Sequence, residues 1–187
     1  MLGRIATIAA LAMGGVMLSK RMKSRGQGNM SFVEESVELD VPVSTAYNQW
    51  TQFEDFPRFM SSVQQVRQLD DTHLRWRATV AGKTKEWDSE ITHQQPDRRI
   101  AWRSITGVPN SGEVTFERLS DSRTRVHLRM EYMPEDVVEE AGDAVGAVRM
   151  QARQNLARFK SMLEERGHET GAWRGAVSGG TARPSTH

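Results

Sequence analysis

The sequence predicts an α+β fold in which a curved antiparallel sheet of seven strands wraps around one long helix, with two short helices after the first strand. Seven segments alternate apolar and polar residues, as half-buried strands do. A helical repeat of apolar residues runs from about residue 136 to 166. The charges on the polar positions of the strand-like segments change sign from one strand to the next, which is typical of a paired sheet.

The first strand and the two short helices are marked by alternation, a proline and local turn signals. Phe32–Val41 alternates with period two, and its apolar positions share one face. Pro42 ends this strand, because proline has no N–H to donate to a neighbouring strand. Ser44 is expected to cap a short helix that runs to Gln52, and a second helical turn is expected at Glu54–Pro57.

Six further strand-like segments follow, separated by short runs of Asp, Gly, Pro, Asn or Ser. They are expected at Val63–Leu69, His73–Val80, Thr84–Gln95, Arg98–Ile105, Gly112–Leu119 and Thr124–Met133. The last element is a long helix from Asp136 to about Arg166, where apolar residues recur at helical spacing. The order is therefore strand, two short helices, six strands and a long helix.

The outward-facing charges predict which strands are neighbours. Basic and acidic segments alternate along the chain, and the first strand is acidic while the last is basic. Opposite charges on paired strands are favourable by about 0.2–1 kcal/mol per pair, so an antiparallel meander with the first strand beside the last satisfies every boundary. The charged face then lies in water, and the long helix covers the other face. The residues expected on the inward face are Leu74, Trp76, Ala78, Val80, Trp87, Ser89, Ile91, His93, Ile100, Trp102, Ser104, Val114, Phe116, Val126, Leu128, Met130 and Tyr132.

A curved sheet wrapped on one helix is expected to leave a cavity between the two. Its lining would be aromatic and rich in methionine, which suits a flat or flexible apolar ligand. The entrance is expected between the second short helix and the loop Gly107–Gly112. The alternative is that these large side chains fill the core themselves. The candidate ligand-binding residues are Trp50, Phe53, Phe56, Phe59, Trp76, Trp87, Trp102, Ser104, Phe116, Met130 and Tyr132.

The two ends of the chain differ in composition from the middle. Residues 1–25 are expected to form a membrane anchor, because an apolar run, Ile5–Leu18, is followed at once by basic residues. The alternatives are a signal segment and a buried helix, since the run is short for a bilayer. An anchor of this polarity places the domain on the cytoplasmic side of the cytoplasmic membrane. Residues 26–30 are expected to be a linker, 31–166 the folded domain and 167–187 a disordered tail, in which Trp173 is either exposed or docked.

Composition and spacing argue against several classes of function. The net charge is +1, and basic residues are matched by acidic ones strand by strand, which argues against nucleic-acid binding. The chain has no cysteine, and its five histidines are scattered, so no metal site is expected. No phosphate-binding glycine loop occurs in a suitable context, so no cofactor is expected. The sequence does not specify an oligomeric state.

Two inward polar residues are the candidates for catalysis. His93 would be a general base, because a histidine titrates near neutral pH, and Tyr132 would be its partner in the cavity. The alternative for His93 is a half-exposed structural role, since it lies near the end of its strand. Arg58 lies near the expected entrance, where it either meets a ligand head group or stays solvated.

Several stretches carry a family resemblance: VELDVPVSTAYNQWTQFEDFPRFM at Val37–Met60, KEWDSEITHQQPDRRIAWRS at Lys85–Ser104, GVPNSGEVTFERL at Gly107–Leu119 and TRVHLRMEYMP at Thr124–Pro134. Over about residues 31–165 the chain resembles the START-like polyketide cyclase/dehydrase and lipid-transport superfamily, in particular its bacterial members. The resemblance implies a helix-grip fold. It also implies one of several functions, because the superfamily includes aromatase/cyclases, ubiquinone-binding proteins, and steroid and lipid carriers.

Three hypotheses for the function follow. The first is a non-enzymatic protein that binds or transports a lipid, quinone, polyketide or similar hydrophobic molecule at the membrane. The second is a polyketide cyclase or dehydratase that acts through His93 and Tyr132. The third is a structural or stress-related interaction protein whose core is filled by its own side chains. The expected partners are thus a hydrophobic small molecule and a membrane.

Overall fold

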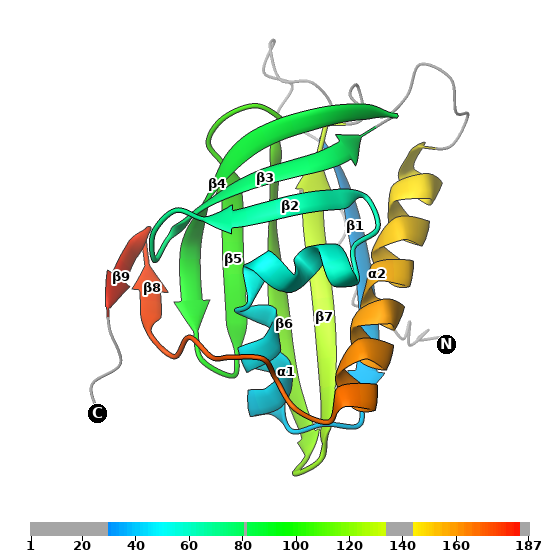
Figure 1. Ribbon diagram of the computed structural model, residues 1–187, viewed down its shortest axis with the longest axis vertical. Helices are drawn as coiled ribbons and strands as arrows, with labels where there is room; N and C mark the ends of the chain where they lie inside the picture. Colours follow the sequence, from blue (N-terminus) through cyan, green and yellow to red (C-terminus); the bar gives the residue numbers. More distant parts are fainter. Residues whose placement is uncertain (1–29, 81, 134–143, 184–187) are drawn as a thin grey trace, which may run out of the picture.

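The computed structural model describes residues 30–80, 82–133 and 144–183 (Figure 1). The elements in chain order are β1 (Ser31–Leu39), α1 (Val43–Trp50), the 3-10 helix η1 (Phe53–Arg58), β2 (Val63–Gln68), β3 (His73–Val80), β4 (Lys83–Gln95), β5 (Arg99–Ser104), β6 (Asn110–Ser120), β7 (Arg123–Tyr132), α2 (Ala144–Arg166), β8 (Ala176–Ser178) and β9 (Thr181–Arg183). The sequence-based order of strands and helices is confirmed. The part of the long helix expected between residues 136 and 143 lies outside the described residues.

One antiparallel sheet forms the body of the molecule, with the strand order β1-β7-β6-β5-β4-β3-β2. β1 pairs with β7, as the charge pattern predicted, and the remaining strands form a meander. The sheet curls so strongly that β2, β3 and β4 cross in front of β5, β6 and β7, while α2 runs along the open side next to β1 (Figure 1). This is the helix-grip architecture, with α1 toward the lower end of the sheet and η1 above it, next to β2.

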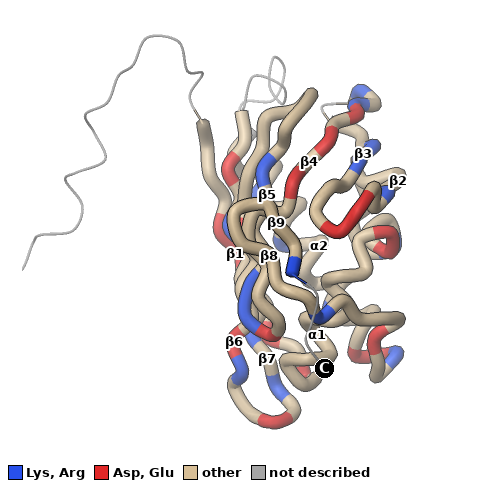
Figure 2. The backbone as a smooth tube through the Cα atoms, turned by 90° about the vertical axis from the view of Figure 1, so that its left-hand side faces the viewer, with Lys and Arg blue, Asp and Glu red and all other residues tan. Residues whose placement is uncertain are grey.

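Ion pairs join neighbouring strands of the sheet as the charge pattern predicted, and Figure 2 shows where the acidic and basic residues lie along these strands. The strands β3 and β4 are joined by Arg75 and Asp88, whose Nε–Oδ1 distance is 2.8 Å. Arg103 pairs with Glu90 across β5 and β4 at 2.8 Å. Arg125 of β7 bridges to acidic side chains on both of its neighbours. Exposed pairs of this kind add little stability, but they favour one register over its alternatives.

The first short helix begins two residues earlier than predicted, because Pro42 and not Ser44 is its N-cap. Pro42 stands at the position before α1, and its carbonyl oxygen accepts a hydrogen bond from the N–H of Ala46. Ser44 therefore lies within the first turn and caps nothing. A proline suits this position because it needs no N–H partner and holds a fixed backbone angle.

The C-terminal segment is ordered, which corrects the disorder predicted for residues 167–187 as far as residue 183. We call residues 167–183 the C-terminal strap. β8 and β9 form a hairpin, and β8 pairs with the end of β4, beyond the position where His73, the first residue of β3, pairs with Glu90. Gly179 and Gly180 form the turn with φ values of 58° and 76°, the backbone that a tight hairpin of this kind needs. The Gly-, Ser- and Thr-rich composition of this segment predicted disorder, but Gly179 and Gly180 form the turn of an ordered hairpin.

Strap side chains also enter the core. Val177 is 4% exposed, and Trp173 packs against the main hydrophobic cluster, so the docked alternative for this tryptophan is the one observed. The anchor predicted for residues 1–25 lies outside the described residues, as does all but the last residue of the predicted linker. Within the described residues, no helix combines the length and apolar character needed to cross a bilayer.

Candidate ligand-binding cavity

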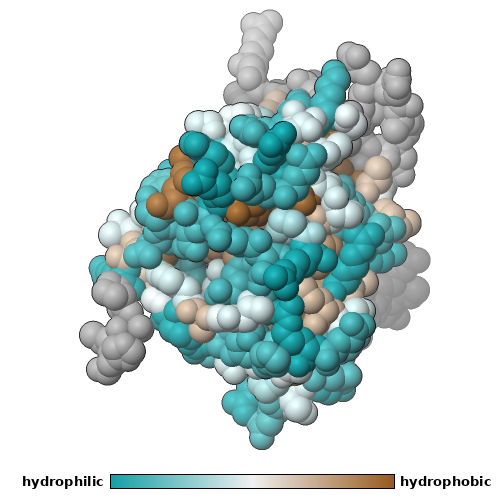
Figure 3. All heavy atoms as spheres, in the orientation of Figure 1, coloured by the Kyte–Doolittle hydropathy of each residue, from teal (hydrophilic) through white to brown (hydrophobic). Residues whose placement is uncertain are grey.

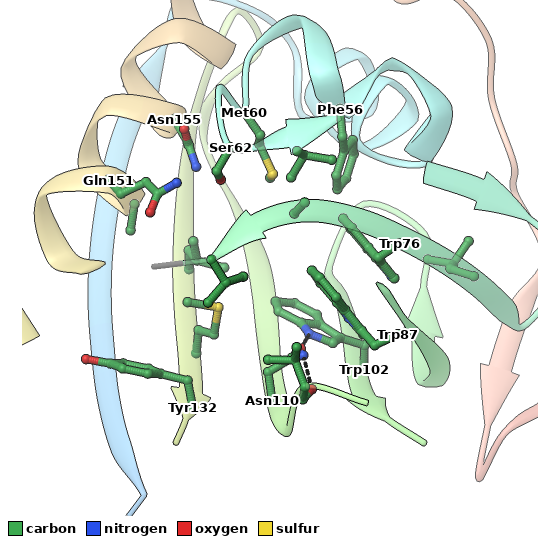
Figure 4. A pocket seen from close by; sticks show the side chains of 18 of the residues that line it. Phe56, Met60, Ser62, Trp76, Trp87, Trp102, Asn110, Tyr132, Gln151 and Asn155 are labelled. Atoms are coloured by element: carbon green, nitrogen blue, oxygen red, sulfur yellow. Dashed lines mark hydrogen bonds between the residues drawn. The ribbon is translucent and has the colours of Figure 1, made fainter. Parts of the chain in front are cut away.

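A cavity of about 270 Å³ lies between the curved sheet and α2 (Figure 4). Its walls are formed by β3, β4 and β5 on one side, α2 on the other, η1 and the β2 start at one end, and the β5–β6 loop with the end of β7 at the other. Figure 3 shows the molecular face around it as largely hydrophilic, with hydrophobic residues visible only between polar ones.

Three tryptophans form one wall of the cavity. The rings of Trp76 and Trp87 lie parallel, with an interplanar angle of 1° and centroids 5.8 Å apart, because they occupy directly opposite positions on β3 and β4. Trp76 Nε1 donates to Ser89 Oγ at 2.8 Å. Trp102 Nε1 donates to Asn110 Oδ1 at 3.1 Å. Trp87 Nε1 is also buried, but it has no hydrogen-bond partner among the described residues.

Two glycines make room for these indoles. Gly112 lies directly opposite Trp102 on β6, and a Cβ placed there would be 2.5 Å from the Trp102 ring. Gly107, with φ of 67°, lies against Trp87, and its Cβ would be 2.9 Å from the Trp87 Cβ. Both glycines belong to the loop predicted as the entrance, and Val108 and Asn110 of the same loop line the cavity. The loop therefore shapes the tryptophan wall.

The opposite wall is α2, which contributes Val148, Gln151, Ala152 and Asn155. These residues are three or four apart, so they lie on one face of the helix. Figure 4 shows the amides of Gln151 and Asn155 on the α2 side of the cavity, across from the tryptophans. Asn155 Oδ1 is buried and has no partner among the described residues. The helix wall is thus partly polar, although the sequence pattern indicated only its apolar positions.

An aromatic cluster closes the end of the cavity at η1. Trp50 packs edge-to-face on Phe56 at 5.6 Å between centroids and on Phe159 of α2 at 4.9 Å. Phe56 in turn contacts Phe59 and Trp76. Edge-to-face pairs are worth about 0.5–1.5 kcal/mol beyond the area they bury. η1 is therefore held by rings on the sheet and on α2.

Most of the predicted ligand-binding residues line the cavity. They are Trp50, Phe53, Phe56, Trp76, Trp87, Trp102, Met130 and Tyr132. Phe59, Ser104 and Phe116 do not. Phe59 is 1% exposed within the aromatic cluster, Phe116 packs on Tyr47 and Trp50, and Ser104 Oγ accepts the N–H of Asn110. Alternation along a strand indicates the inward face, but it does not separate residues that pack from residues that line a cavity.

His93 does not face the cavity, which corrects its prediction as an inward residue. The pairing of β4 with β5 shifts by one between Ile91 and His93, so a β-bulge at Thr92 reverses the alternation. As a result Gln94 points inward and is 3% exposed, while His93 lies opposite Ala101 on the other face. The sequence-based prediction assumed that the alternation of faces continues without interruption along β4. It therefore assigned His93, which follows the bulge, to the wrong face.

The two catalytic candidates are therefore not brought together. Tyr132 lines the cavity, at the end of β7, while His93 lies outside it beside Ser178 of the strap. Within the described residues, no Asp, Glu, His, Lys or Arg side chain lines the cavity, and no group of three or more potential ligands could hold a metal ion. Arg58 also lies outside the lining: it pairs with Asp55 at 3.1 Å and is 60% exposed.

A buried polar cluster connects the strap to the end of the cavity. Gln49 of α1 is 0% exposed, and its amide bonds to Asp55 of η1, to Arg166 at the end of α2 and to Thr170 of the strap. Thr170 Oγ1 also donates to Asp55 Oδ2 at 2.6 Å. Burial alone would raise the pKa of Asp55, but the hydrogen bonds from Thr170 and Gln49 and the charge of Arg58 lower it below its ordinary value.

A second anchor of the strap lies at α1. Arg174 forms two hydrogen bonds to the Asp97 carboxylate, at 2.6 and 2.7 Å, and lies over the Tyr47 ring. Tyr47 is fully buried, and burial raises its pKa to about 12. Its hydroxyl accepts a hydrogen bond from Gln94 Nε2 at 2.9 Å, which satisfies the amide that the bulge turns inward. The strap therefore supports both α1 and η1.

Comparison with known proteins agrees with this geometry. A family model described as polyketide cyclase / dehydrase and lipid transport matches residues 39–160. The chain belongs to this family. The match ends before the strap begins, so the strap is an addition to the part of the chain that the family model describes.

Relatives of this polyketide cyclase/dehydrase and lipid-transport family member share most of its length. An uncharacterized 17.2 kDa protein of Streptomyces lincolnensis is 54% identical over 149 residues, which cover 79% of this chain and 99% of the relative. A solved Deinococcus radiodurans structure is 30% identical, covers 73% of this chain and 99% of its own, and superposes with a TM-score of 0.58. The match to the Zhui aromatase/cyclase of Streptomyces sp. R1128 covers 77% of this chain and 99% of that protein, with a TM-score of 0.63. The two sequences are 20% identical, so this likeness shows the shared fold alone.

Proposed function

We propose that this protein binds an apolar small molecule in the cavity between the sheet and α2 and carries it without changing it chemically. The observation that carries the proposal is the lining, which combines four indole rings, Phe53, Phe56, methionines and aliphatic side chains. Such a surface gives affinity through buried apolar area, at about 25 cal/mol per Å² before the costs of association. Membership in a family described by polyketide chemistry and lipid transport supports the same class of ligand.

The size of the cavity favours a compact ligand. Ligand sites usually measure about 300–1,000 Å³, and an engineered cavity of about 150 Å³ takes up benzene. A volume of about 270 Å³ therefore suits a molecule of roughly two fused rings. A cavity of this size also argues against the hypothesis that the core is filled by its own side chains.

The lining argues for binding over catalysis. General acid–base chemistry requires a titratable group within hydrogen-bond reach of the substrate. Among the described lining residues only Tyr132 carries an ionisable side chain, and the His93 that was its expected partner lies on the opposite face of β4. A carrier needs no such pair.

The test is a titration of the full chain with N-phenylnaphthylamine, a neutral dye whose fluorescence rises in apolar sites. We expect saturable binding at about one dye per chain, with a micromolar Kd. Ala152→Phe, on the cavity face of α2, should abolish binding, because the new ring occupies the space. Ala157→Phe, on the exposed face of the same helix, is the matched control and should bind normally. Equal binding by both variants would place the dye elsewhere and overturn the proposal.

A further inference from the structure

We infer that the ligand of this cavity is uncharged and carries a hydrogen-bonding oxygen at each of two opposite ends. The inference rests on the proposed function and specifies which apolar molecules the cavity selects. Three observations carry it: the neutrality of the lining, the unpaired indole N–H of Trp87, and the unpaired amide oxygen of Asn155. Each limits the ligand in a different way.

The neutral lining excludes a charged group on the buried part of the ligand. No cationic side chain lines the cavity within the described residues, so a carboxylate or phosphate inside it would have no counter-charge. Burying an unpaired ion is far more costly than burying a neutral polar group. Anionic amphiphiles such as fatty acids are therefore disfavoured, even though their chains are apolar.

Trp87 requires an acceptor at the tryptophan wall. Four tryptophans line the cavity. Trp76 and Trp102 have their N–H groups paired to Ser89 and Asn110, and Trp87 is the one whose buried N–H has no partner among the described residues. An indole N–H is a donor only, so its partner must be an acceptor such as a hydroxyl, ether or carbonyl oxygen. A buried donor that stays unpaired costs roughly 1–3 kcal/mol, which a ligand oxygen would recover.

Asn155 requires a second polar group at the helix wall. Figure 4 places its side chain on the α2 side of the cavity, beside Ser62 and one turn beyond Gln151. A primary amide both donates and accepts, and either end can be turned toward a ligand. A ligand hydroxyl at this end would donate to the unpaired Oδ1 atom. Apart from Ser62 and Thr79, the lining between the two walls is apolar, so the middle of the ligand is a hydrocarbon or an aromatic ring.

The experiment compares three probes of the same shape by calorimetry: 2,6-dihydroxynaphthalene, naphthalene and 2,6-naphthalenedicarboxylate. We expect the diol to bind roughly tenfold more tightly than naphthalene, because it adds two hydrogen bonds of modest net strength. The dicarboxylate should bind at least tenfold more weakly than the diol at neutral pH. If the dicarboxylate binds as tightly as the diol, the inference is wrong while the proposed function stands. If none of the three binds, the proposed function fails as well.

Paired variants test the two residues. Trp87→Phe should reduce the preference for the diol over naphthalene several-fold, whereas Trp76→Phe, whose N–H is already paired, should lower both affinities and leave their ratio unchanged. Asn155→Leu should likewise reduce the ratio, and Gln154→Leu on the exposed face of α2 is its control. An unchanged ratio in Trp87→Phe and Asn155→Leu would overturn the assignment of these residues, whatever the affinities.

Discussion

The Gln49 Oε1 atom accepts a hydrogen bond of 3.0 Å from the backbone N–H of Thr170, a residue 121 positions further along the chain. Gln49 is fully buried, so its amide depends on this partner and on Asp55 and Arg166. Because Asp55 belongs to η1, whose phenylalanines close one end of the cavity, the strap contributes to the shape of a site that it does not touch.

Thr170→Val should destabilise the protein by about 1–2 kcal/mol, because the valine cannot donate to Asp55 or accept from Gln49. In a domain of this size, that loss lowers Tm by roughly 2–8 °C. The measurement is thermal unfolding followed by circular dichroism. Thr181→Val, at an exposed position in β9, is the control and should leave Tm nearly unchanged. Equal shifts in the two variants would contradict the role of the Thr170 hydroxyl.

Asp55 makes the same cluster sensitive to acid. Its pKa in the folded state lies below the ordinary value of 3.8, so the ionised carboxylate stabilises the fold above that value. This contribution is lost as pH falls through the folded-state pKa. We expect Asp55→Asn to be less stable than the parent chain at pH 7 and the difference to shrink below about pH 4. Urea unfolding of both proteins from pH 7 to pH 3 measures it, and a constant difference over that range would disprove the linkage.

Tyr47→Phe should cost about 1–3 kcal/mol, because it leaves the buried amide of Gln94 without its acceptor. Neither residue lines the cavity, so dye affinity should stay the same. Urea unfolding gives the stability change. In the double variant Tyr47→Phe, Gln94→Met the polar pair is replaced by an apolar one, and much of the lost stability should return. A double variant with the summed losses of the single variants would show that the pair is not coupled.

Gly112→Ala should damage the cavity through Trp102. The added methyl would meet the indole ring at 2.5 Å and the Arg129 carbonyl oxygen at 2.6 Å, so the ring must move and its hydrogen bond to Asn110 must lengthen. We expect weaker dye binding, by tenfold or more, together with a lower Tm. Ser111→Ala, the adjacent position on the other face of β6, serves as the control. If Gly112→Ala binds the dye with unchanged affinity, the tryptophan wall accommodates the added methyl group, and this prediction is wrong.

The membrane anchor expected at residues 1–25 stays a prediction, since it lies outside the described residues. If it is correct, the full chain will sediment with membranes and resist extraction by high salt, whereas a chain starting at Met30 will remain in the supernatant. Fractionation followed by immunoblotting distinguishes the two. Recovery of the full chain in the supernatant would contradict the anchor.

The fold was predictable because two independent patterns, the alternation of apolar residues and the sign of the surface charges, indicate the same arrangement of strands. The alternating signs from Glu38 to Arg125 to Glu117 correspond to strands that are paired, and each pair also places apolar residues on the inner face. Either signal alone leaves the order of strands ambiguous. Their agreement fixes the antiparallel meander and places β1 beside β7.

The errors have local physical causes. The bulge at Thr92 depends on how β4 bends between two neighbours, which no single-strand pattern records, so the faces of His93 and Gln94 were exchanged. The strap was misread because Gly179 and Gly180 suggest flexibility, whereas the contacts that order the segment come from α1 and β4. Asn155 was not singled out because a polar residue on a helix usually faces water, and only the curvature of the sheet brings it to a cavity.

The distance along the chain between Gln49 and its partners has a consequence for synthesis. Ribosomes add roughly 5–20 residues per second, so α1 and most of the sheet emerge well before Arg166 and Thr170 are made. Until then the amide of Gln49 has no complete set of partners, and η1 lacks the hydrogen bond that Thr170 donates to Asp55. Limited proteolysis of stalled nascent chains of increasing length would reveal when this region becomes resistant. A chain that ends before Arg166 and Thr170 lacks these partners of Gln49. We therefore expect proteases to cleave it in the α1–η1 region faster than they cleave the full chain.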